Sequence, residues 1–93
     1  MIKVIIERKI QYGEELAYDL AARSILGAVL KCDGYISSEQ LYVSGKANHR
    51  VIITHWQSQA HWRAWQDSPE RFAATSFFEP LLTERERILI LQY

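Results

Sequence analysis

Side chains that could bind or transform a small molecule are concentrated in one short part of this sequence. Residues 53 to 70 read ITHWQSQAHWRAWQDSPE and include all three tryptophans and two of the three histidines. Indole rings offer large apolar surfaces with one N–H donor each, and imidazole is the side chain that titrates near neutral pH. The segment therefore has the composition either of a pocket for an aromatic ligand or of an ordinary core.

Helical spacing places most of these side chains on one face. Ser58, His61, Trp62 and Trp65 stand at i, i+3, i+4 and i+7, and Trp56 ends the strand before them. Three buried indole N–H groups would each need a hydrogen-bond partner. The helix expected opposite offers mainly alanine, serine and leucine, which leaves space beside large rings. We expect a tryptophan-lined pocket; the alternative is that each tryptophan simply fills the core.

The remaining reactive side chains give weaker signals. His55 and His61 lie six apart across a strand-to-helix boundary with no third ligand in register, so we predict no metal site. Either could act as a base, with surface placement as the alternative, and His49 is expected in a solvated loop. The single Cys32 excludes an internal disulfide and is interpreted as a packed thiol near a helix end. No phosphate-binding glycine loop or dinucleotide motif is present, so no cofactor is expected.

The elements that would position these residues follow from periodicity and turn signals. We predict strands over 2–9, 35–43, 51–56 and from Arg87 onward, with residues 44–49 as a hairpin loop. One helix should start at Glu14 and stop at Asp33-Gly34, and a second helical region from Ser58 to Pro80 should bend at Ser68. The order predicts an α+β, ferredoxin-like βαββαβ sandwich that forms a single domain over residues 1–93. The residues expected on the core-facing side of the first helix are Leu16, Ala17, Leu20, Ala21, Ser24, Ile25 and Ala28.

The first and last strands carry apolar residues on both faces. Ile5 points away from Ile2, Val4 and Ile6, while Leu89 and its alternate neighbours oppose Ile88 and Ile90. A half-solvated antiparallel sheet alternates apolar with polar residues instead. Two helical regions cover only one face, so we predict a homodimer in which two sheets pack face to face.

Composition limits the classes of partner. Eleven basic residues balance eleven acidic ones, so no net field attracts nucleic acid or an anionic membrane. No segment approaches the ~20 apolar residues that a membrane span needs, and no signal peptide is recognisable. We expect a cytoplasmic protein without nucleic-acid or membrane partners.

The stretch ITHW followed by QSQAHWRAWQDSPERFAA resembles the antibiotic biosynthesis monooxygenase family, whose members show a strand followed by a Trp-Ser-…-Trp-Ser pattern. Here that pattern falls on Trp56, Ser58, Trp65 and Ser68. The stretch GYISSEQL is similar to the family's second strand, through Gly34, Tyr35 and Glu39. The resemblance implies a dimeric α+β barrel built from two ferredoxin-like sheets, in agreement with the uncovered sheet face.

The resemblance also implies a function. Some members oxygenate aromatic compounds with molecular oxygen and no metal or flavin, so we expect a cofactor-independent monooxygenase acting on a small aromatic or quinol-like molecule. Trp65 and Trp62 would hold the substrate, His61 or Tyr35 would handle the proton, and Thr75 would orient an oxygen. The expected catalytic residues are Trp65, His61 and Tyr35, and the expected substrate-binding residues are Trp62, Trp56, Thr75, Phe72 and His55.

Two alternatives stay open. The heme-degrading branch of the superfamily is similar at Trp65 and in SPERFAATS, but its iron-binding histidine falls at Thr75 and its first-strand asparagine falls near Ile6. Heme binding is therefore the second interpretation. A non-catalytic dimer that binds a small hydrophobic molecule is the third.

Overall fold

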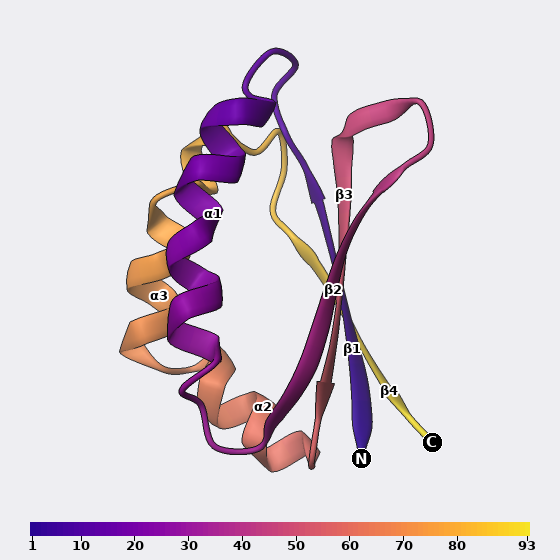
Figure 1. Cartoon of the computed structure of the whole chain (residues 1–93), viewed down its shortest axis with the longest axis vertical. Helices are drawn as coiled ribbons and strands as arrows, with labels where there is room; N and C mark the ends of the chain where they lie inside the picture. Colours follow the sequence, from indigo (N-terminus) through magenta and orange to yellow (C-terminus); the bar gives the residue numbers. More distant parts are fainter.

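The predicted strands form one four-stranded antiparallel sheet, and the helices cover one of its two faces (Figure 1). The computed structural model describes all residues from 1 to 93. The elements are β1 (Ile2–Lys9), α1 (Glu15–Val29), β2 (Tyr35–Val43), β3 (Lys46–Trp56), α2 (Gln59–Gln66), α3 (Pro69–Ser76), the 3-10 helix η1 (Glu79–Leu81) and β4 (Arg87–Gln92). The strand order is β2-β3-β1-β4, which places β4 at one edge, and the predicted ferredoxin-like α+β fold is confirmed.

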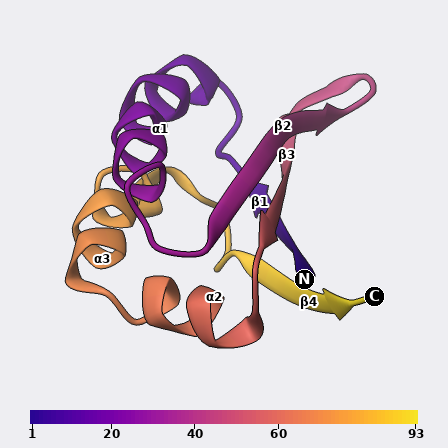
Figure 2. The same ribbon diagram turned by 60° about the horizontal axis from the view of Figure 1, so that its bottom comes forward.

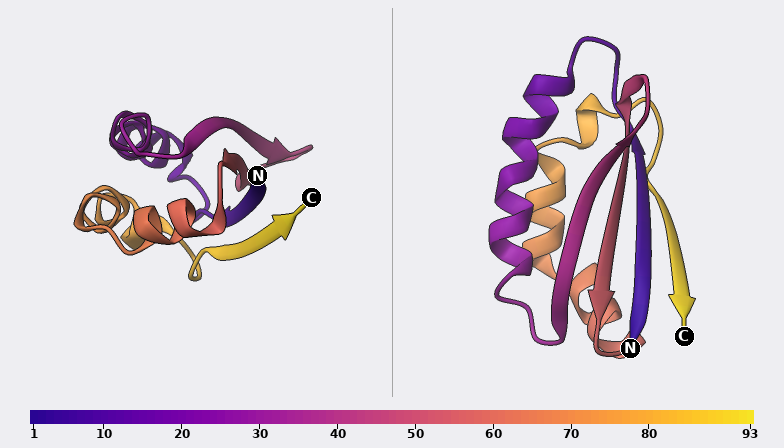
Figure 3. Two further views of the ribbon diagram at one scale, coloured as in Figure 1. Left: turned by 90° about the horizontal axis from the view of Figure 1, so that it is seen from below. Right: turned by 45° about the vertical axis from the view of Figure 1, so that its right-hand side comes forward.

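Strict alternation along β1 creates the core. Ile2, Val4 and Ile6 are at most 4% exposed, and each is followed by a half-buried residue on the other face. Val4 pairs with Thr54 and Ile6 with Ile52, so β3 presents its helix-facing residues beside those of β1. The helices pack over these positions, and the bottom view in Figure 3 shows them all on the same side of the sheet.

Two serine caps set the second helical region. The hydroxyl of Ser58 accepts from the backbone N–H of His61 at 3.2 Å, and that of Ser68 accepts from the N–H of Arg71 at 3.1 Å. Pro69 occupies the first turn of α3, where it sacrifices no helical hydrogen bond. The predicted bend at Ser68 is confirmed, and Figure 2 shows α3 leaving α2 in a new direction. Arg71 lies in the first turn of α3.

Two predicted boundaries were wrong. β3 begins at Lys46 rather than Val51, because Val43 pairs with Lys46 and leaves only a two-residue turn in which Gly45 has a φ of +78°. His49 therefore lies within a strand, 3.2 Å from Glu7, and not in a solvated loop. α1 ends at Val29, and a short turn leads from there to β2.

The core-facing side of α1 also differs from the prediction. Tyr18, Ala22 and Val29 are buried, whereas Leu16 and Leu20 are 72% and 54% exposed. The helix is rotated because the Tyr18 ring packs edge-on against Phe78, with ring centroids 5.3 Å apart. The stripe of small residues that the sequence placed opposite the tryptophans is thus only partly buried.

The sheet face away from the helices, here called the open sheet face, is rich in apolar residues. Register places Ile5 beside Ile53 on one side and beside Leu89 on the other. Leu89 is 56% exposed and Leu91 is 39% exposed. The two-sided apolar pattern of β1 and β4 is therefore confirmed. No helix combines the length and the apolar character that a membrane crossing requires.

The turn before β2 generates a stability prediction. A Cβ on Gly34, where φ is +84°, would lie 2.2 Å from Cγ of His61, whereas a Cβ on Gly13, where φ is +89°, would meet nothing within 4 Å. Gly13→Ala should therefore cost only the ~1–2 kcal/mol of a left-handed alanine. Gly34→Ala should cost about 1–3 kcal/mol more, because the imidazole or the turn must move. Urea unfolding of both variants measures the difference, and equal losses would contradict a close approach of Gly34 to His61.

Candidate functional site

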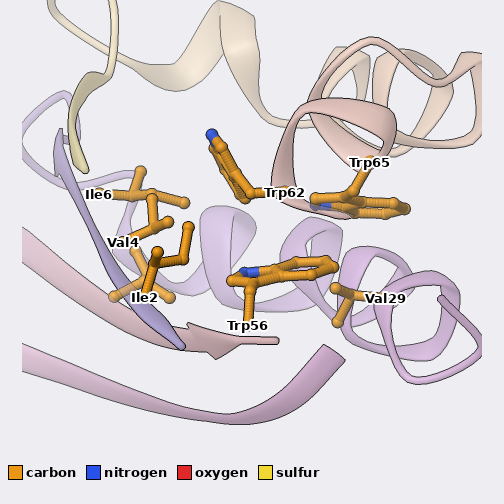
Figure 4. Packing of buried hydrophobic residues seen from close by; sticks show 8 residues of the cluster. Ile2, Val4, Ile6, Val29, Trp56, Trp62 and Trp65 are labelled. Atoms are coloured by element: carbon orange, nitrogen blue, oxygen red, sulfur yellow. The ribbon is translucent and has the colours of Figure 1, made fainter. Parts of the chain in front are cut away.

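The three tryptophans meet between the sheet and the helices. Trp56 from β3 and Trp62 from α2 are completely buried and interlock edge-to-face, with centroids 5.7 Å apart. The indole N–H of Trp56 donates to the Thr54 hydroxyl at 3.0 Å. That of Trp62 points away from Trp56 and Trp65 (Figure 4) and is buried without a partner. Most of the tryptophan surface therefore serves as core, which is the alternative raised by the sequence.

A small cavity remains beside Trp62 and Trp65, and we call it the inner cavity. Its volume is about 40 Å³, well below the ~300–1,000 Å³ of typical small-molecule pockets. It lies between the sheet, α1 and the α2–α3 bend. Its lining comprises Ile6, Arg8, Ile25, Leu26, Val29, Ser38, Gln40, Ile52, Thr54, Trp62, Trp65 and Arg71. Its lining includes the exposed Leu26 and Gln40, so the cavity is not sealed from solvent, and its volume leaves room for only a few atoms.

A larger pocket lies on the other side of Arg71, against α3. This α3 pocket has a volume of about 280 Å³. Its lining comprises Gln66, Arg71, Phe72, Thr75, Phe78, Glu79, Leu82, Arg85 and Glu86. Phe72 and Thr75, both predicted from the sequence to bind substrate, line it. Arg71 lines both spaces and is the residue they share.

Arg71 is held in a buried group of charges. Its Nη2 donates to Oε1 of Glu86 at 2.6 Å, and Nε of Arg8 donates to Oε2 of the same carboxylate at 2.8 Å. Arg8 also donates through Nη1 to the Tyr18 hydroxyl at 2.8 Å and lies 4.4 Å from the centroid of the Phe78 ring. Arg8 from β1 and Arg71 from α3 thus converge on one carboxylate from the segment before β4, and Tyr18 of α1 is joined to this group through Arg8.

The group carries one uncompensated positive charge, because two guanidinium groups share a single carboxylate. Burial by itself raises the pKa of Glu86, but the charges and hydrogen bonds of Arg8 and Arg71 outweigh it, and the pKa is lowered. Arg71 is only 8% exposed, and its Nε has no hydrogen-bond partner. A buried donor on a cation is a position where a ligand anion gains most.

The two other predicted catalytic residues line neither space. Nδ1 of His61 shares a hydrogen bond with the Ser58 hydroxyl, 2.7 Å away, and Nε2 of His61 is 3.8 Å from a fully exposed Asp33. This row of Ser, His and Asp has the order of a hydrolytic triad, but the serine is the cap of α2 and faces no pocket. The Tyr35 hydroxyl is 2.7 Å from the Ser38 hydroxyl, and its ring packs on Trp56. His61 is therefore part of the cap of α2, and Tyr35 packs against the tryptophan cluster.

His55 does not join the tryptophans. Successive strand residues point to opposite faces, so Trp56 enters the core while His55 lies on the open sheet face beside Ser37. His55 was expected to line the tryptophan pocket, but the structure places it on the opposite face of the sheet.

Cys32 is half-buried and packs against the tryptophan cluster, as expected for a structural thiol. Burial raises its pKa, and the nearby carboxylates of Glu70 and Asp33 raise it further. A thiolate nucleophile is therefore disfavoured at this position.

Heme does not fit the residues of either space. Iron in heme proteins is held by His, Cys, Met or Tyr, and none of these lines the inner cavity or the α3 pocket. Thr75, at the position expected for the iron ligand, directs its hydroxyl to the backbone carbonyl of Phe72 at 3.3 Å.

Sequence reasoning missed Arg8, Arg71 and Glu86. A signal for Arg8 was present, because it continues the buried alternation of Ile2, Val4 and Ile6, and a cation on that face requires a partner. Nothing local identified Glu86 as that partner, since the two residues are 78 positions apart.

The shared carboxylate predicts a specific loss of stability. Glu86→Gln leaves two buried guanidinium groups without a counter-charge and should lower the free energy of unfolding by about 3 kcal/mol or more. Glu84→Gln is the matched control, because Glu84 is half-exposed and 3.4 Å from Lys9, and should cost under ~1 kcal/mol.

The pH dependence supplies a second readout of the same variant. Because the pKa of folded Glu86 lies below the ordinary 4.5, its contribution is present above about pH 4.5 and is lost as pH falls through the lower folded value. Unfolding curves of the wild type should therefore weaken more steeply than those of Glu86→Gln as pH drops below 4.5. Parallel pH profiles would argue against the ion group.

Comparisons with known proteins agree with this architecture. The chain superposes on a structure of an asparagine-to-alanine variant of SnoaB, a cofactor-independent oxygenase from Streptomyces nogalater, with a TM-score of 0.87 and 13% identity, covering 99% of this chain and 91% of that one. A conserved protein from Methanosarcina mazei gives a TM-score of 0.89 at 13% identity, with 98% and 90% covered. Rv0793 from Mycobacterium tuberculosis gives 0.84 at 15%, with 99% and 92% covered. At these identities the likeness establishes the fold.

No curated protein matches the sequence significantly. The family described as "Antibiotic biosynthesis monooxygenase" does match, over residues 1–75, which span β1 through most of α3 and include both tryptophan-bearing elements. The chain therefore belongs to the antibiotic biosynthesis monooxygenase family.

Proposed function

We propose that the protein is a cofactor-independent monooxygenase that oxidises a small electron-rich phenol to a quinone. The observation that carries the proposal is the α3 pocket with Arg71 on its inner wall. The pocket volume of 280 Å³ approaches the lower end of the range for organic ligands. Family membership and the likeness to a cofactor-independent oxygenase support the same reaction class.

The pocket offers the contacts that a phenol needs. Phe72 and Leu82 supply apolar surface for a ring, and Thr75 supplies a hydroxyl at the same wall. The pocket is lined by the guanidinium groups of Arg71 and Arg85 and by the carboxylates of Glu79 and Glu86. A phenol whose oxygen lies against one of the guanidinium groups has its pKa lowered there. Because the pocket opens to solvent, the phenol proton passes to water, and neither His61 nor Tyr35 is needed as a base.

The reaction then needs no external reductant. The bound phenolate transfers one electron to O₂, which gives a phenoxyl radical and superoxide, and the two combine through a C–O bond at the ring carbon para to the hydroxyl. The resulting peroxide anion takes up one proton from water, which balances the proton lost by the phenol. The hydroperoxide then loses its ring proton, and its O–O bond breaks to release hydroxide, which combines with that proton to leave as water. The sum is phenol plus O₂ to quinone plus water, with the phenol supplying all four electrons. The protein contributes binding, orientation and stabilisation of the anion.

Oxygen uptake tests this function with a matched pair of variants. Phe72→Ala removes a ring from the pocket wall and should raise KM for a turned-over naphthol about tenfold, as for the loss of ~1–2 kcal/mol of apolar contact. Phe77→Ala removes a ring that lies outside the pocket and is similarly exposed, at 64% against 75% for Phe72, and it should leave KM unchanged. With ¹⁸O₂, one labelled atom should enter the quinone and one should enter water. No oxygen consumption by the metal-free, flavin-free protein across a panel of phenols and naphthols would refute the proposal.

The same proposal includes a homodimer that buries the open sheet face. Leu89, Leu91 and Ile5 form an apolar surface of the kind that soluble monomers rarely leave in water. Two copies packed sheet against sheet would cover it, as the family resemblance implies.

Leu89→Asp should therefore shift the protein to monomer, because a carboxylate would be buried without a partner in the interface. Leu20→Asp is the control, since Leu20 on the far side of α1 is similarly exposed, at 54% against 56%. Sedimentation equilibrium of the two variants at equal concentration measures the difference. A wild type that sediments as a monomer at all concentrations would exclude the dimer.

A further inference from the structure

The uncompensated positive charge of the buried ion group originates in Arg8. Arg71 and Glu86 both line the α3 pocket, and by themselves they would form a neutral pair there. Arg8 does not line that pocket, but its Nε donates to Oε2 of Glu86 at 2.8 Å. Because this second cation shares the same carboxylate, the wall of the pocket carries a positive charge that the pair alone would lack.

Arg8 is fixed in place by groups that do not neutralise it. It is 3% exposed, and its Nη1 donates to the Tyr18 hydroxyl at 2.8 Å. Its guanidinium carbon lies 4.4 Å from the centroid of the Phe78 ring. A hydroxyl and an aromatic face stabilise the cation and leave its charge intact. Because the Glu86 side chain is only 18% exposed, water screens the charge of the group in part and not completely.

The other charged residues around the ion group occur in equal numbers of each sign. They are Arg50 with Asp19 at 2.5 Å, Lys9 with Glu84 at 3.4 Å, Glu7 beside Arg87 in the β1–β4 register, and Glu79 and Arg85, which both line the pocket. Their charges therefore sum to zero. The ion group is left as the source of net positive charge at the α3 pocket.

We infer that Arg8, which does not line the α3 pocket, supplies the charge with which Arg71 holds a phenol there as its anion. The inference rests on the proposed function, in which the phenolate is the form that gives an electron to O₂. Because Arg8 already balances the Glu86 carboxylate, Arg71 keeps a charge that a phenolate can balance in turn. Arg8 is thus a positioning residue that acts through Glu86 and Arg71.

The probe is para-nitrophenol, because its anion absorbs visible light and its proton dissociates near neutral pH. Its nitro group withdraws electrons and disfavours oxidation, and the titration is made under nitrogen, so the readout does not depend on turnover. In the wild type, the pKa of bound para-nitrophenol should lie below that of the free phenol. In Arg8→Met it should rise by about one pH unit, as for the loss of one charge from a partly buried site.

Matched variants separate the charge of Arg8 from its contribution to packing. Arg8→Lys keeps the charge but loses the fork of donors, so it should destabilise the fold and retain the low pKa of the bound phenol. Arg63→Met removes the same charge from an exposed position of α2 outside the pocket, and the pKa of the bound phenol should not change. If Arg8→Met fails to fold, Arg8→Gln removes the charge and keeps an amide donor for Glu86. Phe72→Ala should weaken binding of the probe about tenfold, which would locate it in the α3 pocket.

The outcomes distinguish the role of Arg8 from the proposed function. Equal pKa values of the bound phenol in the wild type and in the neutral variant of Arg8, or equal rises in the neutral variant and in Arg8→Lys, would overturn the role of Arg8 and leave the oxygenase standing. The expected pKa changes without oxygen uptake on any phenol would leave the role of Arg8 and remove the oxygenase. No saturable binding of the probe, or binding that Phe72→Ala leaves unchanged, would overturn both, because no phenolate would then lie beside Arg71.

Discussion

The need to neutralise buried arginines is the constraint on which much of this structure depends. Arg8 stands on the buried face of the central strand β1, where a lone charge would be prohibitively costly. Its carboxylate partner comes from residue 86, just before the last strand, and that carboxylate recruits Arg71 from α3. One ion group thereby fixes the strand, the helix and the segment before β4 relative to one another.

The same ion group divides the space between sheet and helices. Without Arg71 the inner cavity and the α3 pocket would have no charged wall in common. Trp56 and Trp62 close the other end by interlocking edge-to-face, which leaves little freedom to enlarge the cavity by rotating either ring. The sequence predicted space between the tryptophans and the small residues of α1, and the inner cavity is that space, but its volume is enough for only a few atoms. The tryptophans are therefore better understood as a rigid wall than as the surface on which an aromatic substrate lies.

The fold could be predicted from the sequence, but only part of the candidate site could. The β-branched run of β1, the serine cap at Ser68 and the two-sided apolar strands were all local signals, and each was interpreted correctly. Ser58 was placed on the helix face, whereas it caps α2. The face of α1 was misjudged because leucine is the more apolar residue, whereas the structure buries Tyr18, whose hydroxyl reaches Arg8. Long-range pairing is invisible to periodicity, so the partner of Arg8 could not be found in a single sequence. Phe72 and Thr75 were placed at a pocket, but that pocket faces α3 and not the tryptophans.

The open sheet face and the site are linked through the edge strand β4. Arg87, the first residue of β4, directly follows Glu86, and the only sheet neighbour of β4 is β1. An edge strand with exposed apolar residues on one face is weakly held, because half of its contacts are missing. Any loosening of β4 would release Glu86, and two unpaired guanidinium groups would then face the core. Covering Leu89 and Leu91 with a second copy would therefore stabilise more than an apolar surface, since it would hold the carboxylate that positions Arg71 between the two spaces.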